Sequence, residues 1–221
     1  MGKTKKIDWL NHFLEFIVVV VGILLAFQLN TCREAKKETS LVMGHVTNIV
    51  EETEFNRKQL ETGKNNSERL LQKLDTLIKI TAKPELDRST AHSLSMELMS
   101  LDYLYLKKNA YNSLVETGDI RFMENSNLQK DIISLYEYYS WLEGLDISTR
   151  TSYLENYLPY ATENFDLINF QSQADEIYTN KLFRNYLAVY RYSLRYRLQK
   201  QEDLIALIDE FLEKHSSKKL I

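Results

Sequence analysis

The chain has few of the residues that end helices or form turns. Its 221 residues include only 6 glycines and 2 prolines, whereas a chain of average composition carries about 26 of the two together. Sandwiches, barrels and propellers need a turn former at almost every hairpin, so this composition argues against an all-β fold. With 44% hydrophobic and 27% charged residues, the chain is also unlike a disordered one. The composition therefore predicts an all-α protein built from a few long helices.

The usual signatures of catalytic and cofactor chemistry are missing as well. A single cysteine, Cys32, excludes an internal disulfide and a zinc site made of cysteines. The 4 histidines are scattered, and no phosphate-binding loop, dinucleotide fingerprint, nucleophile elbow or HExxH motif is present. The net charge of −3 gives no overall attraction for nucleic acid. We therefore expect no catalysis, no cofactor, no metal and no nucleic-acid partner.

The longest apolar segment lies near the N-terminus. Residues 16–27 are apolar without a break, and extending the segment outward to Trp9 and Leu29 reaches the roughly 20 residues that cross a bilayer core. We expect a transmembrane helix over residues 7–30, with the membrane as a partner. A cleaved signal peptide is the alternative, although no A-x-A-like site follows the run. The sequence before Cys32 leaves open a lipoprotein cleavage box, in which a smaller residue than Thr31 is usual.

Positive charges flank both ends of this segment. Lysines within residues 3–6 precede it, and basic residues within 33–37 follow it. The positive-inside rule is therefore almost balanced, and the N-terminal amine tips it towards an N-terminus inside the cell. We expect a short cytoplasmic tail over residues 1–6 and a C-terminal domain that faces the periplasm or the exterior.

Beyond the membrane segment, apolar residues keep a helical spacing. A heptad-like stripe is formed by Val42, Val46, Ile49, Thr53 and Leu60. The first helix is expected to end at residues 63–66, where glycine, lysine and two asparagines follow one another. A second helix over roughly 67–81 should then return along it. We therefore predict a juxtamembrane helical hairpin over residues 31–82.

The remaining residues, 83–221, predict a helical bundle domain. A helix that opens at Ser89 has leucines through Leu104, a short helix over 109–117 should stop at Gly118, and the next should begin after Asn125. Residues 174–215 contain no proline or glycine, so one long helix is expected there. Its expected buried stripe is Leu182, Tyr186, Val189, Tyr190, Leu194, Leu198, Leu204, Ile208, Phe211 and Leu212.

Residues 14–30 read LEFIVVVVGILLAFQLN, and residues 109–123 read NAYNSLVETGDIRFM ahead of a Tyr138-Tyr139 pair. These stretches are similar to the E-hydrophobic-VVxGILxAxQxN anchor and the aYxxLxxxGxLxLI…YY block of a bacterial family of single-pass membrane proteins, a domain of unknown function. The chain departs from the family at Thr31-Cys32, where Asn-Trp is common, and at Thr117, where serine is usual. The resemblance implies a bacterial inner-membrane anchor, a helical exterior domain and no assigned activity.

The first candidate site lies in the anchor. Glu15, Gly22 and Ala26 fall on one face of a helix that turns by about 100° per residue. Gly22 and Ala26 form a small-xxx-small pair that lets two helix backbones approach closely. A carboxylate within hydrocarbon usually faces protein or water. We predict a helix–helix interface that contains Glu15; alternatively, Glu15 extends to the headgroups and Gly22 is incidental.

The second candidate site, for a partner, is a run of basic and aromatic residues that contains no acid from 184 to 201. Its members are Arg184, Tyr186, Tyr190, Arg191 and Arg195. Such a run can bind an anionic partner. The interpretation that we favour is that the tyrosines are half-buried and the arginines pair with acids of neighbouring helices. The acids Glu116 and Asp119 at the Gly118 turn have no histidine, serine or lysine nucleophile beside them, which favours a capping role.

Together these features predict a membrane-anchored helical scaffold or partner-binding protein. It is expected to form a homo-oligomer through its anchor and heptad-like stripe, or to bind a membrane-protein partner. The first alternative is a single-anchor subunit of a proton-driven membrane complex, in which Glu15 carries the proton. The second alternative is an enzyme of unknown type.

Overall fold

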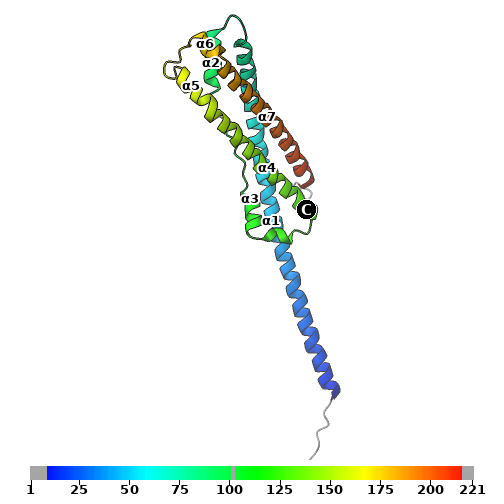
Figure 1. The fold of residues 1–221 in the computed structure, drawn as a ribbon. Coiled ribbons are helices and arrows are strands. Elements are labelled where there is room, and N and C mark those ends of the chain that lie inside the picture. Colours follow the sequence, from blue (N-terminus) through cyan, green and yellow to red (C-terminus); the bar gives the residue numbers. More distant parts are fainter. Residues whose placement is uncertain (1–8, 101–102, 216–221) are drawn as a thin grey trace, which may run out of the picture.

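The computed structural model describes residues 9–100 and 103–215. Within these residues all regular elements are helices, which confirms the all-α prediction. Figure 1 shows an elongated head from which one long helix projects. The expected cytoplasmic tail over residues 1–6 lies outside the described residues.

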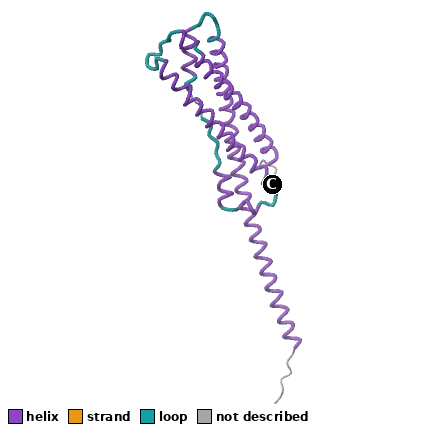
Figure 2. The backbone as a smooth tube through the Cα atoms, viewed as in Figure 1, coloured by secondary structure: helices purple, strands orange, loops and turns teal. Residues whose placement is uncertain are grey.

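The longest element is α1, which runs without interruption over 72 residues from Trp9 to Ile80. Its N-terminal part stands clear of the other helices, and its C-terminal part belongs to the head (Figures 1 and 2). The predicted turn at residues 63–66 is absent, and the predicted hairpin over 31–82 is therefore wrong. Gly63 is buried, and a β-carbon at this position would lie 3.3 Å from Gln201 Nε2. The glycine therefore allows α1 and α7 to approach closely and does not form a turn.

Three long helices form the head: the C-terminal part of α1, α4 (Ser126–Ser152) and α7 (Lys181–His215). Helix α7 is antiparallel to α1, because Arg57 contacts Asp209 while Asp75 contacts Arg195. Helices α2 (Arg88–Glu97), α5 (Leu158–Asn164) and α6 (Asp175–Thr179) gather at the distal end (Figure 1). Helix α3 (Asn109–Glu116) and the 3₁₀ turn η1 (Asp119–Phe122) lie at the end nearest the free part of α1.

Two expected helices are shorter in the structure. Helix α2 ends at Glu97, and residues 103–108 are irregular, so the helix expected to reach Leu104 is wrong. The side chain of Asn56 replaces the missing helical bonds there, since it donates to the Lys107 carbonyl and accepts from the Lys107 N–H, both at 2.8 Å. The helix expected over 174–215 is interrupted at Asn180, whose Oδ1 accepts from Phe183 N.

Helix boundaries that depend on local caps agree with expectation. Helix α3 ends just before Gly118, whose φ of 74° suits a glycine. Helix α4 begins after Asn125, which accepts hydrogen bonds from the N–H groups of Asn127 and Leu128. The expected stripe of α7 is correct in its C-terminal half. In its N-terminal half it is displaced, because Leu182 and Val189 are exposed and Phe183 is buried.

The core consists of two hydrophobic clusters. The proximal cluster packs residues 42–60 of α1 against α3, α4 and the C-terminal half of α7. The distal cluster packs residues 74–80 against α2, α5, α6 and the N-terminal half of α7. The heptad-like stripe of α1 lies in the proximal cluster, so it is covered within the chain. Between the clusters is a polar layer, defined here as the buried residues Ser67, Asp146, Thr149, Arg197 and Gln201.

Candidate functional site

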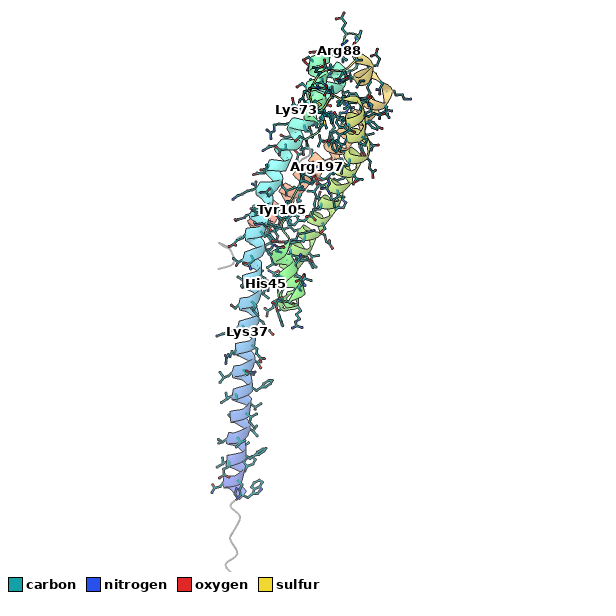
Figure 3. All side chains as sticks on the ribbon, turned by 90° about the vertical axis from the view of Figure 1, so that its left-hand side faces the viewer. Lys37, His45, Lys73, Arg88, Tyr105 and Arg197 are labelled. Atoms are coloured by element: carbon teal, nitrogen blue, oxygen red, sulfur yellow. The ribbon has the colours of Figure 1, made fainter. Side chains whose placement is uncertain are left out.

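The N-terminal part of α1 is the first candidate site. Its apolar stretch has no buried residue, and the helix is long and apolar enough to be a candidate membrane span. Figure 3 shows its side chains projecting freely on all sides. Glu15, Gly22 and Ala26 are all exposed, and a β-carbon at Gly22 would meet nothing within 4 Å. Glu15 Oε2 lies 3.3 Å from His12 Nδ1.

The face of α1 that holds Glu15, Gly22 and Ala26 lies opposite the face that forms the core. Val42 lies about seven and a half helical turns beyond Glu15, so the two side chains point in opposite directions. Ser40 lies about five full turns beyond Gly22, as Gly44 does beyond Ala26. Both Ser40 and Gly44 are exposed, and a β-carbon at Gly44 would also meet nothing within 4 Å. Arg33 lies about five full turns beyond Glu15 and is exposed as well. We call the residues Glu15, Gly22, Ala26, Arg33, Ser40 and Gly44 the open face of α1.

The basic and aromatic run on α7 separates onto two sides of that helix. Arg191 and Arg195 lie 3.5 and 3.0 Å from the carboxylate of Asp75 on α1. The pairing of these arginines with an acid of a neighbouring helix is therefore confirmed. Arg184 is exposed and lines a shallow pocket with Ile78 and Thr81 on the same side. The tyrosines turn towards residues 153–160 instead, where Tyr186 contacts Tyr160 and Tyr190 contacts Tyr153. The structure therefore does not bring the five candidate residues together.

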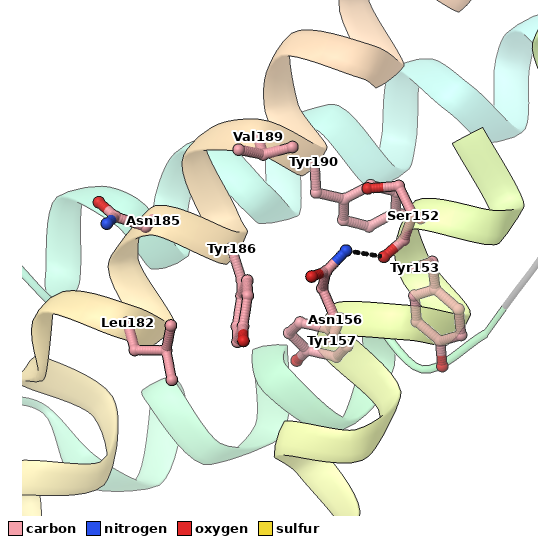
Figure 4. A pocket seen from close by; sticks show the side chains of 9 residues that line it. All are labelled: Ser152, Tyr153, Asn156, Tyr157, Leu182, Asn185, Tyr186, Val189 and Tyr190. Atoms are coloured by element: carbon pink, nitrogen blue, oxygen red, sulfur yellow. Dashed lines mark hydrogen bonds between the residues drawn. The ribbon is translucent and has the colours of Figure 1, made fainter. Parts of the chain in front are cut away.

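Tyr186 and Tyr190 line a cavity of about 290 Å³ between the distal end of α4 and α7. Figure 4 shows Tyr186 extending from α7 towards Tyr157 and Asn156 on the facing segment. The residues that line the cavity are Ser152, Tyr153, Asn156, Tyr157, Leu182, Asn185, Tyr186, Val189 and Tyr190. The sequence had indicated the two tyrosines, but the facing wall was not anticipated.

That facing wall is a π-helical turn, η2 (Tyr153–Tyr157), inserted between α4 and α5. Pro159 explains the turn, because it has no N–H for the carbonyl of Glu155 and its ring would crowd that carbonyl in an α-helix. The helix widens instead, and Leu158 N donates to the Tyr153 carbonyl five residues earlier. The side chain of Asn156 donates to the Ser152 carbonyl at 2.8 Å (Figure 4). The wide turn opens the wall of the cavity.

A group of polar contacts joins α1 to the neighbourhood of residues 109–123. Glu52 is buried, and it accepts from Tyr136 Oη at 2.6 Å and from Ala110 N at 3.1 Å, near the N-terminus of α3. Burial and the neighbouring Glu52 carboxylate raise the pKa of Tyr136 well above its usual value. Glu52 thereby attaches both α3 and α4 to α1.

The turn at Gly118 is also tied to α1. Asp119 Oδ2 accepts from Thr117 Oγ1 at 2.8 Å and lies 3.0 Å from His45 Nε2. The Thr117 hydroxyl, followed by His45, lowers the pKa of the Asp119 carboxyl. The expectation that no histidine stands beside Asp119 is thus wrong, because His45 comes from α1. His45, Glu52 and Asn56 lie at helical spacing along α1, and each contacts a segment distant in sequence.

Among the described residues, no group of three or more histidine, cysteine, aspartate and glutamate side chains could hold a metal ion. Cys32 is a free, exposed thiol on the projecting part of α1. No family model, curated protein or solved structure matches this chain.

Proposed function

We propose that this protein is a membrane-anchored helical scaffold that self-associates through the open face of α1 and presents its head to a partner. The observation that carries the proposal is the position of that face: it is exposed, it has small residues at two levels with Arg33 between them, and it lies opposite the core of the head. The anchor would cross a bacterial inner membrane once, with the N-terminus inside and the head in the periplasm.

The arrangement of α1 supports a parallel pair of anchors. Two helices that meet at Gly22 and Ala26 can approach closely, because neither residue holds the backbones apart. Ser40 and Gly44 keep the same direction up to the base of the head, so the two helices can stay adjacent there. The heads would then lie on the outer sides of the pair. The heptad-like stripe takes no part, because Val46 and Ile49 are fully buried within each chain.

The test compares Gly22→Leu with Val20→Leu in the full-length chain, with association measured by crosslinking in membranes. Leucine at position 22 inserts four carbons between the backbones, and we expect association to weaken by about 1 kcal/mol or more. Val20 lies about 140° from Glu15 around the helix, so its substitution should leave association unchanged. Equal association of the two variants would show that the open face is not the interface.

A second experiment examines the aqueous part of the same face. In a Cys32→Ser background, Ser40→Cys should form a disulfide between two chains under mild oxidation, whereas Leu41→Cys, rotated by about 100°, should not. Equal yields at positions 40 and 41 would contradict the parallel arrangement above the membrane.

A second candidate function is a single-anchor subunit of a proton-driven complex. The observation that favours it is the Glu15 carboxylate, which contacts the His12 ring and is otherwise exposed. Glu15→Gln distinguishes the two functions. Under the scaffold proposal the variant weakens assembly in a graded way, whereas a proton carrier would lose its cellular activity while assembly is kept.

A further inference from the structure

The cavity between η2 and α7 has the dimensions of a small-molecule site. Its volume of about 290 Å³ is roughly twice that of an engineered cavity of about 150 Å³ that binds benzene. Along α7 the lining extends from Leu182 to Tyr190, which is about 12 Å of helix. That length suits a molecule of two rings, and it is too short to seat several turns of a partner helix.

The floor of the cavity is apolar although it is made of tyrosines. Tyr153, Tyr157 and Tyr190 are almost completely buried. The hydroxyl of Tyr157 donates to the Ser95 carbonyl at 2.7 Å, and that of Tyr153 donates to the Met99 carbonyl at 3.0 Å. Because these two hydroxyls are already bonded to α2 and the segment after it, their rings are what a ligand would contact. Flat ring walls favour a flat ligand.

The polar groups of the cavity carry no charge, and they include the side-chain hydroxyls of Ser152, Tyr186 and Tyr190 as well as two amides. Asn156 uses its Nδ2 for the Ser152 carbonyl, and among the described residues its Oδ1 accepts no hydrogen bond. Asn185 is exposed at the edge, and its side chain likewise has no hydrogen-bond partner in the described part of the chain. No lysine, arginine, aspartate or glutamate lines the space. An ionic ligand would therefore lose its hydration without gaining a counter-charge.

The mouth of the cavity exposes apolar side chains to water. Leu182 and Val189, one on each side of Tyr186 along α7, are 52% and 53% exposed. A ligand that covered them would remove this apolar surface from water. The π-helical turn also supports a binding site here, because such turns are rare and occur frequently at functional sites.

From this geometry we propose that the cavity binds a neutral aromatic molecule of about two fused rings with one hydrogen-bonding substituent. The rings would lie among Tyr157, Tyr186 and Tyr190, and the substituent would donate to Asn156 Oδ1. The inference is independent of self-association through α1, since the cavity lies at the other end of the head.

The probe for the test is 2-naphthol, added to full-length protein in lipid nanodiscs with 3-fluorotyrosine in place of tyrosine. The ¹⁹F resonance of Tyr186, assigned with Tyr186→Phe, should shift and saturate at about 0.1–1 mM probe. The resonance of Tyr192, which is 74% exposed outside the cavity, should not saturate in this range. A Tyr186 shift that only grows linearly with probe, as partitioning into lipid would give, overturns the proposal.

Two comparisons examine the shape and charge of the site. Val189→Trp places a large ring at the mouth from an exposed position, and it should raise the apparent dissociation constant at least about tenfold. Val115→Trp, at a similarly exposed site on α3, should leave that constant unchanged. The anion 2-naphthoate should bind at least about tenfold more weakly than 2-naphthol. If Val189→Trp bound 2-naphthol as well as the wild type does, the site would be overturned. If 2-naphthoate bound as well as 2-naphthol, the ligand class would be overturned.

Discussion

Arg197 on α7 and Asp146 on α4 form an ion pair inside the head, with Nη2 2.7 Å from Oδ1 and both side chains less than a tenth exposed. The pair belongs to the polar layer between the two hydrophobic clusters. In the same layer the Ser67 hydroxyl donates to Gln201 Oε1 at 3.3 Å. Each of the three long helices thus contributes a polar side chain at this level, which favours one register of the helices over others.

Removal of one partner from this pair should be costly. Asp146→Ala leaves the guanidinium of Arg197 buried without its counter-charge, and we expect the free energy of unfolding to fall by about 3–5 kcal/mol. Chemical unfolding followed by circular dichroism measures it. Asp75→Ala, which removes the partly exposed partner of Arg191 and Arg195, should cost less than about 1 kcal/mol. Similar losses for both variants would contradict the special cost of the buried pair.

The contact between Tyr136 and Glu52 should contribute to stability in the proximal cluster. Tyr136→Phe removes the hydroxyl and leaves a buried carboxylate oxygen without its donor, so a loss of about 1–3 kcal/mol is expected in the same unfolding experiment. Tyr138→Phe is the matched control, because its hydroxyl makes only an exposed 3.4 Å contact with Asp203. If the two variants were equally stable, the Glu52 contact would make no net contribution to the free energy of unfolding.

Two glycines should respond to alanine in opposite directions. Gly118 has a φ of 74°, where a β-carbon is strained, so Gly118→Ala should destabilise the head by about 1–2 kcal/mol. Gly144 lies within α4 with open space around its α-carbon, so Gly144→Ala should stabilise it by about 0.5–1 kcal/mol. If both variants shifted the melting temperature in the same direction, one of the two glycines would have a backbone conformation other than the one described.

Stability at acidic pH should depend on Asp119. Its pKa is lowered in the folded state, chiefly by the Thr117 hydroxyl and then by His45. A lowered pKa contributes stability that is complete above the unfolded value of about 3.9 and is lost as the pH falls through the folded value. Thr117→Val should therefore melt below the wild type at pH 6, and the difference should shrink at pH 3. Thr47→Val, whose hydroxyl bonds only to the Met43 carbonyl, should show no such convergence.

The parts of the fold that could be predicted are those that depend on neighbouring residues. The end of α3 at Gly118 and the start of α4 after Asn125 follow from a left-handed glycine and a side-chain cap, both visible locally. The continuity of α1 through residues 63–66 could not be predicted in this way. A glycine followed by polar residues is a typical turn sequence, whereas in the fold α7 packs against Gly63 and Lys64 pairs with Glu202 of α7.

The candidate sites show the same division. The open face of α1 follows from helical periodicity, because Glu15, Gly22 and Ala26 belong to one uninterrupted helix. The cavity could be indicated only in part, since a π-helical turn far along the chain supplies the wall that faces Tyr186. The contact of His45 with Asp119 joins residues 74 positions apart. No local pattern predicts such a pair, and it becomes visible only when η1 is placed against α1.

The uninterrupted course of α1 also fixes how far the head stands from the proposed membrane-spanning segment. From Leu29 to Ile80 the helix measures about 75 Å, and about 18 Å of that is the bare stretch below the head. A flexible linker of the same number of residues would let the head sample many positions, including contact with the lipid surface. A single helix lacks this freedom, so under the proposed function the cavity at the distal end is held at a nearly constant distance from the membrane-spanning segment. The length of α1 thus fixes this distance, and a partner that reaches the distal end must itself extend equally far.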